Sequence, residues 1–86
     1  MFEALYYQHG HGRSPAAERA EMQGRLPLTR AIPMLARRIG TTQKQARTIL
    51  EEWGPCGFYR TGKYARITAY YDVALLAEIY RWEVEP

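Results

Sequence analysis

Five polar residues between positions 42 and 48 have the side chains and spacing needed to hydrogen-bond with nucleic-acid bases. They are Thr42, Gln43, Lys44, Arg47 and Thr48. In a helix, residues three and four apart share a face, so these side chains would form one polar surface about one helix wide. A glutamine amide pairs well with adenine and an arginine guanidinium with guanine, each giving about 1–3 kcal/mol of discrimination. Double-stranded DNA is therefore the first partner to consider.

Two short predicted helices joined by a glycine position this polar surface. Apolar residues recur at helical spacing before Gly40, which is expected to end the first helix with a positive φ. Thr41 or Thr42 is expected to cap the second helix, which extends over about residues 42–53. The residues expected to form the core shared by both helices are Ile32, Leu35, Ala36, Ile39, Ala46, Ile49 and Leu50. An ordinary helical hairpin with a solvated basic face is the alternative interpretation.

The positive charge of the chain is concentrated around these helices. The sequence has a formal net charge of +3, but residues 25–66 contain nine Lys and Arg against two Glu. Residues 72–86 contain one Arg against four acidic residues. Such a basic block attracts polyanions in a salt-dependent way, although many charged blocks only keep a protein in solution. The cations best suited to DNA phosphates are Lys44, Arg60, Lys63, Arg37 and Arg38.

A β-hairpin is predicted over residues 57–68, with Thr61-Gly62 as a two-residue turn. This turn would pair Arg60 with Lys63 at the tip of the hairpin. The face expected to close over the helices comprises Phe58, Ala65 and Ile67. The opposite face comprises Tyr59, Tyr64 and Arg66.

Further elements are predicted before the two helices. Ser14 is expected to cap a helix over about residues 15–23, and residues 25–28 are expected to be extended. The next helix has two possible starts. Thr29 is a suitable cap, but it would place Pro33 inside the helix, where proline removes a hydrogen bond. A helix that begins at Pro33 avoids this cost, so the start stays open.

A C-terminal helix is predicted over residues 72–82, with Asp72 as its cap. It is apolar on more than one side, and such a helix has to be buried against two surfaces. One stripe comprises Val73, Leu76 and Tyr80. The other comprises Leu75, Ile79 and Trp82. The second stripe is expected to pack against a second copy of the chain in a homodimer or, equally, against residues 2–7.

Length and composition predict a single α+β domain over residues 1–86. A chain of 86 residues with 47% hydrophobic residues can form one modest core, and residues 1–13 are expected to form an extended segment and a loop. We expect no signal peptide and no membrane-spanning segment, and a cytoplasmic location.

The sequence offers little for catalysis or metal binding. A single cysteine, Cys56, excludes a disulfide within one chain and is expected to be a small residue in a turn. His9 and His11 lie in a glycine loop without a third ligand at a suitable spacing. We expect no metal, no cofactor and no enzymatic activity.

The order of a helix, two helices joined by a tight turn, a basic hairpin and a closing helix resembles the winged helix-turn-helix superfamily of small prokaryotic and phage DNA-binding regulators. The resemblance covers about residues 15–68 and concerns architecture. It implies a fold of three helices, a two-stranded wing and a C-terminal helix. It also implies that the recognition helix enters the major groove through Thr42, Gln43, Lys44, Arg47 and Thr48. The wing would contact DNA through Arg60, Lys63 and Arg66.

The expected function is sequence-specific binding of double-stranded DNA, by a transcriptional regulator or a recombination accessory factor. One short recognition helix gives little specificity, so a dimer is expected. The alternative is a protein–protein interaction module or inhibitor that uses the same fold and an aromatic surface. That surface would include Tyr6, Tyr7, Tyr59, Tyr64, Tyr70 and Tyr71. A third possibility is RNA or single-stranded DNA binding, with bases stacked on Tyr59 and Tyr64.

Overall fold

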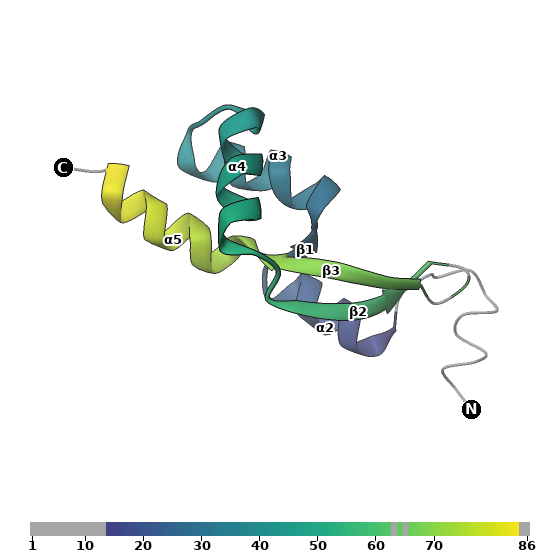
Figure 1. Ribbon diagram of the computed structural model, residues 1–86. Helices are drawn as coiled ribbons and strands as arrows, with labels where there is room; N and C mark the ends of the chain where they lie inside the picture. Colours follow the sequence, from purple (N-terminus) through teal and green to yellow (C-terminus); the bar gives the residue numbers. More distant parts are fainter. Residues whose placement is uncertain (1–13, 63, 65, 85–86) are drawn as a thin grey trace.

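Helices and strands follow one another closely in a computed structural model of the chain, which describes residues 14–62, 64 and 66–84 (Figure 1). Their order is α2 (Pro15–Met22), β1 (Arg25–Pro27), α3 (Leu28–Ile39), α4 (Gln43–Trp53), β2 (Gly57–Thr61), β3 (Arg66–Asp72) and α5 (Val73–Val84). The three strands form one antiparallel sheet in the order β1-β3-β2. The α+β class expected from the sequence is confirmed.

The sheet separates α2 from the other helices. In Figure 1, α2 lies below the strands, α3 and α4 lie above them, and α5 continues away from the end of β3. The Ser14 side chain accepts a hydrogen bond of 3.1 Å from the N–H of Ala17, so Ser14 caps α2 as predicted. Strand β1 pairs Leu26 with Tyr71 of β3, and Leu26 is buried in the core beside α3.

Helices α3 and α4 pack against each other through small and branched side chains. Ala46, Leu35 and Leu50 are fully buried, and Ala36 is nearly so, as predicted for the contact between two closely packed helices. Gly40 follows α3 with φ +67°, a left-handed conformation that glycine adopts at little cost. The sequence therefore predicted this pair of helices and the turn between them correctly.

The start of α3 differs from both predicted positions. The helix begins at Leu28, directly after the strand residue Pro27. Pro27 stands at the cap position in an extended conformation and has no side-chain group that could accept a capping hydrogen bond. Pro33 lies inside the helix and has no N–H to offer the carbonyl of Thr29. The helix tolerates this loss because its other face is anchored in the core by Ala31 and Leu35, which are both fully buried.

The β2–β3 hairpin forms as predicted, but its register is different. Thr61 pairs with Arg66, so residues 62–65 make the connection and the predicted two-residue turn is wrong. Arg60 consequently lies opposite Ile67. Lys63 and Ala65 lie outside the described residues.

The covered face of the hairpin is also the opposite of the predicted one. Phe58 and Ile67 share a face, but they are 64% and 55% exposed. The other face carries Tyr59, which packs beside Tyr70 and the α2 residues Ala17 and Ala20. The two alanines leave room for the tyrosine rings, and α2 therefore covers this face.

Helix α5 closes the core along one stripe. Its first turn is capped by Asp72, whose side chain accepts a hydrogen bond of 3.0 Å from the N–H of Leu75, as predicted. Val73 and Leu76 are buried, whereas Leu75 on the second stripe is 48% exposed. The predicted contact of this stripe with residues 2–7 lies outside the described residues, as does the side chain of Trp82. Within the described part of the chain, every helix is too short or too polar to cross a membrane.

Candidate nucleic-acid interface

The N-terminal half of α4 brings together the polar residues singled out in the sequence. Ala46 and Leu50 anchor one face of the helix in the core. The opposite face is exposed and contains Gln43, Lys44, Arg47 and Thr48, with Thr42 at the cap. This surface is a continuous part of one helix, as the periodicity predicted.

The two threonine hydroxyls on this surface are occupied by the helix itself. Thr42 accepts a hydrogen bond of 3.1 Å from the N–H of Gln45, which makes it the cap rather than Thr41. Thr48 donates a hydrogen bond of 3.1 Å to the carbonyl of Lys44. Thr42 therefore already uses its oxygen as an acceptor, and Thr48 already uses its hydroxyl hydrogen as a donor. Each hydroxyl has only part of its hydrogen-bonding capacity left for a ligand.

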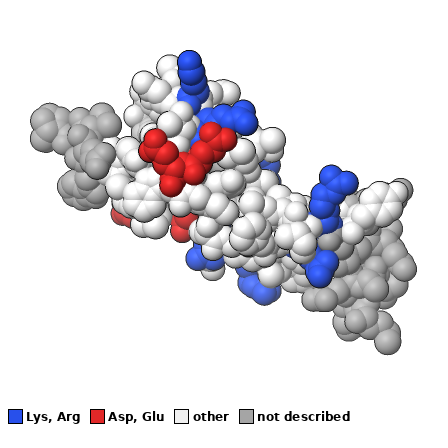
Figure 2. All heavy atoms as spheres, in the orientation of Figure 1, with Lys and Arg blue, Asp and Glu red and all other residues white. Residues whose placement is uncertain are grey.

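Arg47 is paired along its own helix. Its Nε lies 3.3 Å from Oε2 of Glu51, one turn further on, and both side chains are more than half exposed. Glu52 follows on the same helix and is also exposed. Figure 2 shows acidic side chains next to basic ones over α4. The exposed surface of α4 is thus mixed in charge, a feature visible in the sequence as an arginine and a glutamate four residues apart.

The basic residues of the hairpin lie on different faces. Arg60 shares the exposed face with Phe58, whereas Arg66 shares the face of Tyr59. Both arginine side chains are exposed. The third predicted contact, Lys63, lies outside the described residues. Figure 2 shows basic side chains at this end of the molecule, well separated from those over α4.

The predicted tyrosine surface is only partly present. Tyr70 is buried, so its assignment to an exposed aromatic patch was wrong. Its ring centroid lies 5.0 Å from that of the half-buried Tyr59, and the two rings meet edge to face. Tyr64 is 82% exposed. Tyr6 and Tyr7 lie outside the described residues.

Cys56 lies in the turn between α4 and β2 and is exposed, as expected for a turn residue. Its Sγ donates a hydrogen bond of 3.4 Å to the carbonyl of Tyr70. Partial burial, and next the negative charge of Asp72, raise the pKa of the Cys56 thiol above its ordinary value. The thiol is therefore protonated at neutral pH and a poor nucleophile.

The described residues contain no cluster of three or more His, Cys, Asp or Glu that could hold a metal ion. The histidines considered in the sequence, His9 and His11, lie outside this part of the chain.

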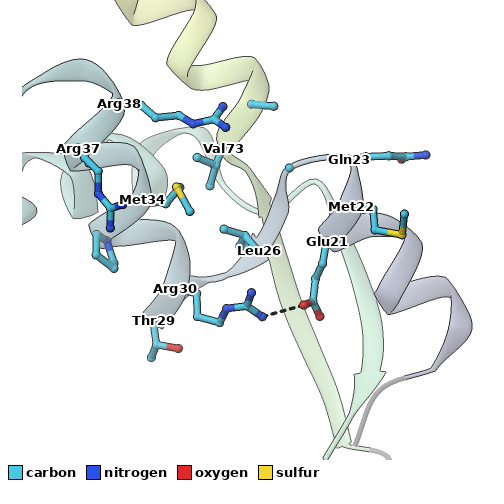
Figure 3. Close-up of a pocket in the computed structure, with 13 residues that line it drawn as sticks. Glu21, Met22, Gln23, Leu26, Thr29, Arg30, Met34, Arg37, Arg38 and Val73 are labelled. Carbon is cyan, nitrogen blue, oxygen red and sulfur yellow. Dashed lines mark hydrogen bonds and ion pairs between the residues drawn. The ribbon is translucent and has the colours of Figure 1, made fainter. Parts of the chain in front are cut away.

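Three further arginines gather on α3, on one side of that helix. Arg30, Arg37 and Arg38 line a hollow between α2, β1, α3 and the start of α5 (Figure 3). The sequence suggested phosphate contacts for Arg37 and Arg38, but it gave no sign of the hollow. Their spacing of seven and eight residues from Arg30 could have shown that all three share a face.

Comparisons of the chain with protein-family models, with curated proteins and with solved structures found no match.

Proposed function

We propose that this protein binds double-stranded DNA in the manner of a winged helix-turn-helix protein. Helix α4 would lie in the major groove, and the β2–β3 hairpin would contact the sugar–phosphate backbone. The observation that supports this most is the exposed polar face of α4, whose opposite face packs in the core through Ala46 and Leu50. A groove about 12 Å wide admits one such helix.

Gln43 and Lys44 are the two residues of α4 whose side chains are most readily available to contact DNA. Within the described part of the chain, neither side chain forms a hydrogen bond or an ion pair, so DNA would not have to displace a protein partner. Gln43 suits an adenine edge, and Lys44 suits a phosphate as a mobile point charge. Both lie in the first turn of α4, where the unpaired N–H groups also favour an anion.

Arg47 would have to exchange Glu51 for a base or a phosphate. An exposed pair of this spacing stabilises a helix by only about 0.3–0.5 kcal/mol. A bidentate contact of Arg47 with guanine is worth about 1–3 kcal/mol of discrimination against the wrong base. Loss of the Glu51 pair is therefore a small cost, although the Glu51 carboxylate left behind would repel nearby phosphates.

Specific recognition of a long site would require a second copy of the chain, since one short helix reads only a few base pairs. The partly exposed second stripe of α5 is our proposed contact between the two copies. A transcriptional regulator or a recombination accessory factor would use such a dimer on a two-fold or repeated site.

The proposal is tested by the salt dependence of binding to a random-sequence duplex, followed by fluorescence anisotropy. The logarithm of affinity should fall linearly with the logarithm of salt concentration. Lys44→Gln should reduce that slope by about 1, because it removes one phosphate contact. Arg19→Gln removes the same charge from the exposed side of α2 and should leave the slope unchanged. Folded protein that does not bind duplex at low salt would refute the proposal.

A second candidate function is supported by the exposed face of the hairpin. Phe58 and Ile67 are both more than half exposed on one face, which is unusual for large apolar side chains so close together. A protein partner that covers this face would make the chain an interaction module. Phe58→Ser would abolish binding of such a protein partner. The same variant should still bind DNA, because the DNA contacts proposed for α4 do not involve Phe58.

A further inference from the structure

A hollow of about 610 Å³ lies at the junction of α2, β1, α3 and α5, on a surface that the proposed DNA contacts do not use. Its size falls within the range of about 300–1,000 Å³ typical of small-molecule sites. Figure 3 shows the side chains that surround it.

One wall of the hollow is fixed by a close approach of two backbones. Gly24, in the turn after α2, has φ +86°, and its carbonyl accepts a hydrogen bond of 3.3 Å from the N–H of Ala74. A Cβ on Gly24 would lie only 2.6 Å from the Cβ of Ala74. The turn therefore packs directly on the first turn of α5, and the wall is part of the fold.

The floor of the hollow is partly apolar. The half-buried residues Pro33 and Met34 supply its accessible apolar surface, whereas Leu26 and Val73, which also line it, are almost completely buried. Methionine adapts its shape to an apolar ligand and contacts aromatic rings favourably. A flat hydrocarbon group would gain from burial against Met34 and Pro33.

The rim of the hollow is cationic, and two of its charges are not neutralised. Arg30 Nη1 lies 2.7 Å from Oε1 of Glu21, so these two charges compensate each other. Within the described part of the chain, Arg37 and Arg38 form no ion pair. Figure 3 shows Arg38 reaching from α3 toward the start of α5, on the side of the hollow opposite Glu21 and Arg30.

We propose that this hollow binds a small organic anion with a flat apolar body. Arg38 holds the carboxylate, for which the planar guanidinium group is geometrically matched, and Arg37 adds a second positive charge from the same helix. The apolar body lies against Met34 and Pro33. A bare DNA phosphate would gain nothing from this floor, and the pairing of Glu21 with Arg30 limits repulsion of the anion.

The three methionines of the chain offer a direct readout of binding. Met34 and Met22 both line the hollow, so their methyl groups can be followed by NMR in protein with ¹³C-labelled methionine methyls. The Met34→Leu variant assigns the Met34 signal. The probe is naphthalene-2-carboxylate, and its control is the neutral naphthalene-2-carboxamide, which has the same body without the charge.

The carboxylate should shift the Met34 signal saturably, and the amide should bind about tenfold more weakly, since it lacks the charge-assisted hydrogen bonds. Arg38→Gln should weaken carboxylate binding by a similar factor, while Arg19→Gln should not, because Arg19 does not line the hollow. If Arg38→Gln does not fold, Arg37→Gln is measured with the same expectation. Equal binding of the two probes, an unshifted Met34 signal, or unchanged affinity in the folded arginine variant would overturn the proposal.

Discussion

The hydroxyl of Tyr70 donates a hydrogen bond of 2.8 Å to Oε2 of Glu21, across 49 positions of the sequence. The other oxygen of this carboxylate is bound by Arg30, and the Glu21 side chain is only 8% exposed. One carboxylate therefore connects α2 with the central strand β3 and with α3. This connection fixes the position of α2, below the sheet, relative to α3, above it.

We predict that Tyr70→Phe lowers the free energy of unfolding by about 1.5–3 kcal/mol, since it removes a hydrogen bond to a nearly buried carboxylate. Urea denaturation followed by circular dichroism measures the change. Tyr59→Phe is the matched control, because the Tyr59 hydroxyl has no hydrogen bond within the described residues. An equal decrease in the free energy of unfolding in the two variants would show that the Tyr70–Glu21 hydrogen bond does not stabilise the fold.

Two glycines with positive φ should respond differently to alanine. Gly40→Ala meets no neighbouring atom within 4 Å, so it should cost only the conformational penalty of about 1–2 kcal/mol. Gly24→Ala pays that penalty and also forces a new Cβ against Ala74, which adds about 1–3 kcal/mol. Thermal or urea unfolding of both variants compares them. A Gly24→Ala variant as stable as Gly40→Ala would contradict the close packing of that turn on α5.

Cys56 should react slowly with iodoacetamide, because its raised pKa leaves little thiolate at neutral pH. Asp72→Asn removes a negative charge that raises this pKa, so the pH at half-maximal alkylation rate should fall. Asparagine is also a good helix cap, so α5 should keep its first turn. The pH profile of alkylation in both proteins is the measurement, and a midpoint that moves upward would contradict the assignment of Asp72.

The pair α3–α4 was predictable because its signals are local. Apolar spacing, Gly40 and the capping Thr42 all lie within one short stretch of sequence and favour the same structure. Glu51 was visible in the same way, four residues after Arg47, and its effect on the charge of α4 could have been inferred.

The covered face of the hairpin depended on a distant element. Alternation divided the strands correctly into a face with Phe58 and a face with Tyr59, but it could not show which face is buried. That outcome depends on Ala17 and Ala20 of α2, about forty residues earlier, whose small side chains accept the tyrosine rings. Thr61-Gly62 was an equally local signal and favoured a two-residue turn. The structure instead pairs Thr61 with Arg66, so the connection is four residues long.

The hollow beside α3 was not predictable for a similar reason. Its wall depends on contact between Gly24 and Ala74, which are fifty positions apart in the sequence. Nothing near either residue indicates that they meet. The arginines of α3 could be placed on one face by their spacing, but the apolar floor beneath them required the fold.

The pair Arg47 and Glu51 gives the most direct test of DNA binding through α4. Anisotropy with duplex DNA at low and moderate salt would compare the wild type with Arg47→Glu and Glu51→Gln, all checked for folding by circular dichroism. We predict a loss of about tenfold or more for Arg47→Glu. We also predict a gain of about twofold or more for Glu51→Gln, because the arginine no longer has to leave its partner. Glu78→Gln, the same change on the exposed surface of α5, should have a smaller effect. Folded Arg47→Glu protein that binds duplex as tightly as the wild type would contradict the central claim.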